Sequence, residues 1–92
     1  MITALVEIDV ERGRVAETAQ RIVDIEGMAE VWSVTGGCDL VALVKLHEFD
    51  ALAEVVAETV AAMPEVLRTN TVLAFKVYSK QDLEESFAVG AG

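Results

Sequence analysis

The sequence predicts an α+β fold in which two strand-helix-strand units form one four-stranded antiparallel sheet. Segments with the apolar alternation of strands take turns with segments that have the apolar stripe of a helix, in the order strand-helix-strand-strand-helix-strand. The two halves also share dipeptides at one constant separation: Leu5-Val6 recurs as Leu40-Val41, and Glu30-Val31 recurs as Glu65-Val66. These repeats favour two similar units.

The first half predicts two strands separated by a helix. Residues 1–9 alternate between an apolar and a mixed face, as a half-buried strand does. Residues 14–25 carry apolar side chains at helical spacing, and Gly27 follows at a position where glycine commonly ends a helix. Residues 29–35 are then expected to form the second strand.

The second half repeats this order. A third strand begins at Cys38 or Asp39 and ends at Leu46, and a second helix is expected over residues 48–63. The only proline follows that helix directly and ends it. Residues 69–78 are rich in threonine, valine and aromatic residues and predict the fourth strand.

Right-handed crossovers between these strands give a ferredoxin-like fold with both helices on one face of the sheet. A chain of 92 residues has the length of one domain. We expect residues 1–78 to form that domain and residues 79–92 to form a short C-terminal helix, over 81–87, and a disordered tail.

Composition excludes several functional classes. The net charge of −9 and the absence of clustered basic residues argue against direct binding of nucleic acid. The longest aliphatic run, residues 40–44, is far too short to span a membrane, and no signal peptide is evident. A single cysteine and a single histidine predict no internal disulfide, no metal site and no cofactor, as expected for a cytoplasmic protein.

The expected sheet has two apolar faces, and this predicts a partner. A monomer with both helices on one face of the sheet needs a polar opposite face. Here residues 40–44 are apolar at consecutive positions, residues 72–78 are apolar on both sides, and 53% of the chain is hydrophobic. We therefore expect a homodimer in which the open sheet faces pack together.

The turn at residues 35–39 is the first candidate site. Gly36 and Gly37 supply the positive φ angles of a tight hairpin and expose backbone N–H groups beside the carboxylate of Asp39. Such a turn can be a simple connection or the mouth of a small-molecule site. Thr69 and Thr71 share one strand face, either as ordinary strand formers or as paired hydrogen-bonding groups.

Asp39 and Glu48 lie at opposite ends of the third expected strand. At about 3.3 Å per residue they are separated by roughly 20 Å or more, so they cannot act as a pair within one chain. In an oligomer they could meet across subunits. His47 and Cys38 have no evident partner that would activate them, and we expect no catalytic residue.

Three motifs, in this order and spacing, resemble one known family. Residues 34–40 (VTGGCDL), 64–66 (PEV) and 69–73 (TNTVL) are similar to the effector-binding domain of the leucine-responsive/AsnC (feast/famine) transcription regulators, also called the RAM domain. The resemblance extends from Ile2 to about Tyr78. It implies a ferredoxin-like protomer, a dimer closed through its sheets as a dimeric α/β barrel, and assembly of dimers into rings.

The resemblance also implies a ligand and its site. The family binds small amino-acid effectors between dimers. The positions of this sequence that match the family's ligand-binding positions are Gly36, Gly37, Cys38, Asp39, Glu48, Thr69 and Thr71. Backbone N–H groups of the glycine turn suit the carboxylate of an amino acid, and an acidic side chain suits its ammonium group.

The chain departs from the family pattern in two ways. Full-length regulators carry an N-terminal helix-turn-helix, whereas this sequence starts at the first strand. We therefore expect a stand-alone domain that does not bind DNA and acts through partner proteins, such as full-length regulators with which it co-assembles. The family often has an aromatic residue where this chain has Cys38, and this difference is expected to affect ligand affinity and identity.

These observations leave three functional classes. The favoured class is an amino-acid-sensing and oligomerisation module. The first alternative is a small enzyme of the dimeric ferredoxin-like barrel type, such as a monooxygenase or isomerase, although the apolar sheet faces and the single His47 argue against it. The second alternative is a structural oligomerisation domain without a ligand.

Overall fold

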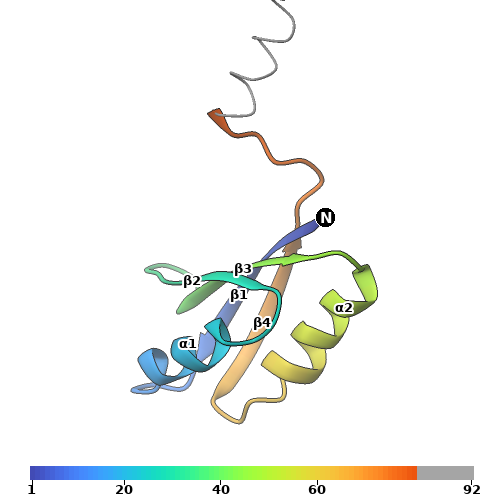
Figure 1. Ribbon diagram of the computed structural model, residues 1–92. Helices are drawn as coiled ribbons and strands as arrows, with labels where there is room; N and C mark the ends of the chain where they lie inside the picture. The colour runs from blue at the N-terminus through green and yellow to red at the C-terminus, as the bar shows by residue number, and fades with distance from the viewer. Residues whose placement is uncertain (81–92) are drawn as a thin grey trace, which may run out of the picture.

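The computed structural model describes residues 1–80, and the helix expected over residues 81–87 lies outside this range. The chain forms β1 (Ile2–Val10), α1 (Val15–Val23), β2 (Met28–Ser33), β3 (Leu40–Leu46), α2 (Phe49–Ala53), η1 (Glu54–Val60) and β4 (Val66–Leu73) (Figure 1). The π-helical segment η1 continues α2, so the two form one helical segment where the sequence predicts one helix.

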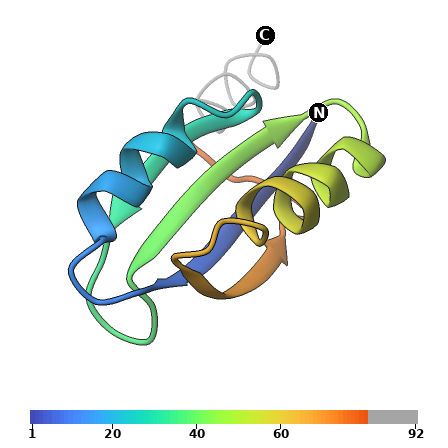
Figure 2. The same cartoon turned by 90° about the horizontal axis from the view of Figure 1, so that it is seen from below.

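The four strands form one antiparallel sheet in the order β2-β3-β1-β4. Both helical segments cover the same face of this sheet (Figure 2). Within residues 1–80, no further helix or strand covers the opposite face, which we call the open face. The predicted ferredoxin-like α+β fold is confirmed. In this topology β2 and β4 are the edge strands. The helix α1 connects β1 to β2, and the segment α2–η1 connects β3 to β4.

The core lies between the helices and the central strands. In β1 and β3, alternate side chains point toward the helices, because Ala4 pairs with Val44, Val6 with Ala42 and Ile8 with Leu40. These side chains are buried, together with Val10, Ile22, Leu52 and Val60. The alternation read from residues 1–9 therefore assigned the core face of β1 correctly.

The fourth strand is displaced from its expected position over residues 69–78. β4 begins at Val66, which pairs with Val10, and ends at Leu73, which pairs with Ala4. One further hydrogen bond, from the Ala74 N–H to the Thr3 carbonyl (2.9 Å), completes the pairing. The chain then bends at Phe75 and leaves β1, although Ile2 of β1 would lie opposite this residue, so strand-forming composition alone overestimated how far β4 continues.

The open face of the sheet is divided into an apolar and a polar part. Its apolar side chains are those of Leu5, Trp32, Val41, Leu43 and Val72, which alternate with core residues along their strands. Toward the β2–β3 turn the same face carries charged and amide side chains from β1 and β4. The expected apolar face is therefore present over β3. Near the β2–β3 turn, β1 and β4 make the same face polar.

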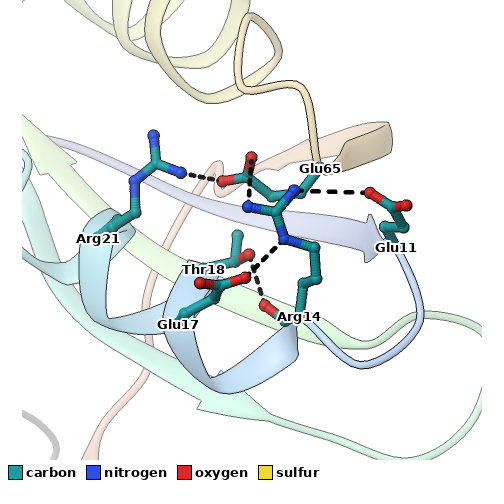
Figure 3. Close-up of polar contacts among 6 residues, drawn as sticks. All are labelled: Glu11, Arg14, Glu17, Thr18, Arg21 and Glu65. Atoms are coloured by element: carbon teal, nitrogen blue, oxygen red, sulfur yellow. Dashed lines mark hydrogen bonds and ion pairs between the residues drawn. The ribbon is translucent and has the colours of Figure 1, made fainter.

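A buried carboxylate anchors the connection that leads into β4. The Glu65 side chain is 1% exposed; its Oε1 pairs with the Arg21 guanidinium, and its Oε2 lies 3.9 Å from Nη2 of Arg14 (Figure 3). The Glu65 carbonyl also accepts a hydrogen bond from the Glu11 N–H (2.8 Å). These contacts join α1, the end of β1 and the start of β4, and so position the strand ends that carry the polar part of the open face.

Arg14 also forms an exposed pair that shifts the ionisation of its partner. Its Nε donates to Oε1 of Glu17 at 2.6 Å, which lowers the pKa of Glu17 and raises the pKa of Arg14. Because folding lowers the pKa of Glu17, the contact stabilises the fold above the unfolded pKa of this carboxyl and is lost as the pH falls through the folded pKa.

This pair predicts a measurable titration. In the wild-type protein, carbon-detected NMR should find the Glu17 carboxyl titrating below its ordinary value, and Arg14→Gln should move that midpoint upward. Arg12→Gln, which removes a neighbouring exposed arginine, is the matched control and should leave the midpoint unchanged. An equal shift in both variants would mean that general charge, and not the hydrogen bond, sets this pKa.

Candidate functional site

A polar cavity of about 410 Å³ lies between the β2–β3 turn and the strands β1 and β4. The residues that line it come from the neighbouring strands β1 and β4 and from the turn. Its lining consists of Glu7, Asp9, Gly37, Cys38, Arg68, Thr69 and Asn70. The volume lies within the range of small-molecule sites.

Two cross-strand pairs form the floor of this cavity. The β1–β4 register sets Glu7 opposite Asn70 and Asp9 opposite Arg68. The Asn70 amide donates to Oε1 of Glu7 at 2.7 Å, and Nε of Arg68 lies 3.0 Å from Oδ2 of Asp9. These polar groups are thus placed by strand pairing and held by their own contacts.

The cavity contains charges of both signs. Glu7 and Asp9 supply carboxylates, and Arg68 supplies a guanidinium whose side chain is 71% exposed. Asp9 contacts the Nε of Arg68, and the two terminal nitrogens of the guanidinium carry further N–H donors. A ligand that carries one cationic and one anionic group can therefore find an opposite charge for each within a single cavity.

The turn is held over this cavity by backbone contacts and by one carboxylate. Gly36 has φ +109°, a conformation that favours glycine. The Asp39 N–H donates to the Ile8 carbonyl (3.0 Å), and the Asp39 carbonyl accepts from the Val34 N–H (3.1 Å). Oδ2 of Asp39 accepts from the Val10 N–H at 2.8 Å. Asp39 therefore fixes the turn to the end of β1 and is not one of the residues that line the cavity.

A second, apolar groove of about 230 Å³ lies on the helix side, between the second helical segment and β4. Phe49, at the start of α2, is 59% exposed beside it. The groove is lined by Phe49, Leu52, Ala53, Val56, Ala57 and Thr71. Its lining offers apolar contact and almost no charge.

The site residues expected from the sequence fall into separate places within one chain. The structure brings Gly37, Cys38 and Thr69 together in the polar cavity, with Gly36 in the adjoining turn. Thr71 lines the apolar groove. Glu48 is exposed at the N-terminal end of α2, which is the opposite end of β3 from the turn.

Four residues that line the polar cavity were not predicted as site residues from the sequence: Glu7, Asp9, Arg68 and Asn70. Alternation along β1 places Glu7 and Asp9 on the face opposite Val6, and this was a usable signal. The identity of their partners required the register between β1 and β4, which are far apart in the sequence. No local pattern reports that register.

The cavity and fold agree with a match to one family. Residues 3–83 match the model of the Lrp/AsnC ligand-binding domain. The chain belongs to this family. The resemblance read from the glycine turn and the two C-terminal motifs is thereby confirmed.

Solved structures similar to this Lrp/AsnC domain include short proteins and longer regulators. TTHA0845 from Thermus thermophilus has 42% identity and a TM-score of 0.81, and the match covers 87% of this chain and 100% of that one. Escherichia coli AsnC has 15% identity, a TM-score of 0.78 and coverage of 85% and 53%. The Neisseria meningitidis regulator NMB0573, solved as an L-Met complex, has 14% identity, a TM-score of 0.76 and coverage of 85% and 52%. The chain thus spans about half of each regulator, and these two likenesses concern the fold.

Three further searches found nothing. None of the curated proteins compared with the chain matches it. Within residues 1–80, no helix combines the length and apolarity that a membrane span requires. In the same part of the chain, no cluster of three or more His, Cys, Asp or Glu side chains could hold a metal ion.

Proposed function

We propose that this Lrp/AsnC domain is a regulatory module that binds a free amino acid in the polar cavity. The observation that carries the proposal is the presence of Glu7, Asp9 and Arg68 in one cavity beside the exposed backbone of the β2–β3 turn. Family membership supports a ligand-binding role over the enzyme alternative, because the matching model describes a ligand-binding domain. The meningococcal regulator, solved with L-Met, is a protein of this fold that binds a free amino acid.

The charges suggest how the amino acid lies. Its carboxylate pairs with the terminal nitrogens of Arg68 and accepts hydrogen bonds from the backbone at Gly37. Its ammonium group faces Glu7, whose Oε1 is already shared with the Asn70 amide. The side chain of the amino acid then points toward Cys38, a smaller residue than the aromatic often found there in the family.

Residues that lie outside the cavity in one chain can contribute from a neighbouring chain. We propose a homodimer that packs through the apolar part of the open sheet face and assembles further into a ring of dimers. In such an assembly Glu48 and Thr71 of another chain can approach the turn at Gly36 and Asp39. Full-length Lrp/AsnC regulators in the cytoplasm, which share this domain, are the proposed protein partners.

Isothermal titration calorimetry against the standard amino acids tests the proposal. At least one amino acid should bind at millimolar concentration or below. The corresponding amine without the carboxylate, and the N-acetylated amino acid without the ammonium charge, should bind far more weakly because each leaves one cavity charge unpaired. Absence of binding by every amino acid at millimolar concentration would contradict sensing and favour a structural oligomerisation domain.

A further inference from the structure

The segment that follows β4 leaves the body of the domain (Figure 1). We call residues 74–78 the C-terminal arm. Phe75 is 102% exposed, Val77 57% and Tyr78 71%. Apolar and aromatic side chains gathered on a projecting segment indicate a contact that one chain alone does not satisfy.

The outer edge of β4 has no strand beside it within the part of the chain that the structure describes. β4 is an edge strand, and within residues 1–80 it pairs only with β1. Because the Ala74 N–H donates to Thr3 of β1, backbone alternation turns the N–H and C=O groups of Thr69, Thr71 and Leu73 outward. An edge of this kind is a template for another strand.

We propose that two copies of this chain exchange their C-terminal arms, each arm extending β4 and pairing antiparallel with β4 of the other copy. Two-fold symmetry requires one residue to lie opposite its own copy. With Leu73 at this position, Phe75 lies opposite Thr71 and Val77 opposite Thr69 of the second copy. The arm bends at Phe75 in the single chain, and pairing straightens it.

This register places Phe75 at a groove that suits it. Thr71 lies on the helix side of β4, because it pairs with the buried Val6, and it lines the apolar groove beside Phe49 and Leu52. Side chains opposite each other in an antiparallel pair point to the same face. Phe75 of one copy therefore enters the apolar groove of the other, whose volume is about 230 Å³.

In the same register, Lys76 and Tyr78 meet complementary groups on the open face. Lys76 lies opposite Asn70, whose amide is bonded to the exposed carboxylate of Glu7. Tyr78 lies opposite Arg68, and the face of an aromatic ring attracts a guanidinium through a cation–π interaction. In the single chain, Nζ of Lys76 already lies 5.1 Å from the centroid of the Tyr78 ring. The exchanged arm thus brings a cation and an aromatic ring to the rim of the polar cavity.

Disulfide trapping tests this register. In a Cys38→Ser background, Leu73→Cys should form a disulfide-linked dimer, because directly opposed residues of a hydrogen-bonded pair have Cα atoms about 5.5 Å apart. Phe75→Cys alone should not crosslink, whereas a mixture of Thr71→Cys and Phe75→Cys chains should crosslink to each other. Absence of a Leu73→Cys dimer, or equal crosslinking of Leu73→Cys and Phe75→Cys, would overturn the proposal.

Sedimentation of a charge variant provides a test without new cysteines. Phe75→Asp should weaken self-association at the β4 edge by about tenfold or more and leave the melting of the monomer unchanged, because Phe75 contacts solvent in the single chain. Ala16→Asp, an exposed position on α1, adds the same charge and should associate like wild type. Association that survives Phe75→Asp but is lost in Leu43→Asp would assign the dimer to the open sheet face alone and contradict arm exchange. Neither experiment requires an amino-acid ligand, so arm exchange and ligand binding can fail separately.

Discussion

Arg68→Gln should weaken binding of the amino acid by about thirtyfold or more, because it removes a charge-assisted contact worth about 2 kcal/mol with the ligand carboxylate. The fold should be nearly unaffected, since the Arg68 side chain is 71% exposed and its pair with Asp9 lies at the surface. Calorimetric titration with the tightest-binding amino acid measures the affinity, and thermal melting checks the fold.

Two further variants sharpen this result. Arg12→Gln removes another exposed arginine, one that does not line the cavity, and should bind like wild type. Glu7→Gln should weaken binding of the amino acid but have little effect on binding of a carboxylic acid that lacks the ammonium group. If Arg68→Gln and Arg12→Gln bind the amino acid equally well, the cavity does not recognise the ligand carboxylate through Arg68.

Glu65→Gln should lower the free energy of unfolding by about 2 kcal/mol, because it replaces the charged acceptor of Arg21 and Arg14 in a buried position. The side chains of Arg21 and Arg14 are 52% and 39% exposed and can regain water, so the loss stays below that of a fully buried broken pair. Urea denaturation followed by circular dichroism measures this loss.

Glu17→Gln is the matched control for this change. It removes a carboxylate that also contacts Arg14, but one that is exposed, and should cost clearly less than Glu65→Gln. If the two variants are equally stable, burial of Glu65 does not decide its contribution, and the connection into β4 is held by other contacts.

The sequence predicts the fold most accurately where a local pattern determines the structure. Alternation in residues 1–9 assigned Val6 and Ile8 to the core face, and both are fully buried. The end of β4 was missed because the chain bends away from β1 at Phe75, and strand propensity does not report this bend. Strand-forming residues such as Val77 and Tyr78 continue past that limit and are exposed.

The candidate site shows the same division. The glycine turn and Thr69 were found from the sequence and line or adjoin the polar cavity. Arg68 was missed because its pairing with Asp9 comes from a long-range register. Glu65 stands within a motif of the family, yet no local signal shows that its carboxylate is buried against two arginines of α1 and its N-terminal turn.

The roles of the expected ligand residues remain predictions that one chain cannot fulfil alone. Asp39 accepts the Val10 N–H and so shapes the turn, which leaves ligand contact by this residue to an assembly. Glu48 and Thr71 lie away from the polar cavity and depend on a neighbouring chain in the same way. The division of residues 1–78 and 79–92 into domain and tail is also a prediction still to be tested.

The most direct test of the proposed function is amide chemical-shift mapping of the ¹⁵N-labelled protein during titration with amino acids. A binding amino acid should shift the resonances of Gly36, Gly37, Cys38, Thr69 and Asn70, which surround the polar cavity, and saturate with a single affinity. Shifts confined to the helix side of the sheet, or no shifts with any amino acid at millimolar concentration, would contradict amino-acid binding in the polar cavity.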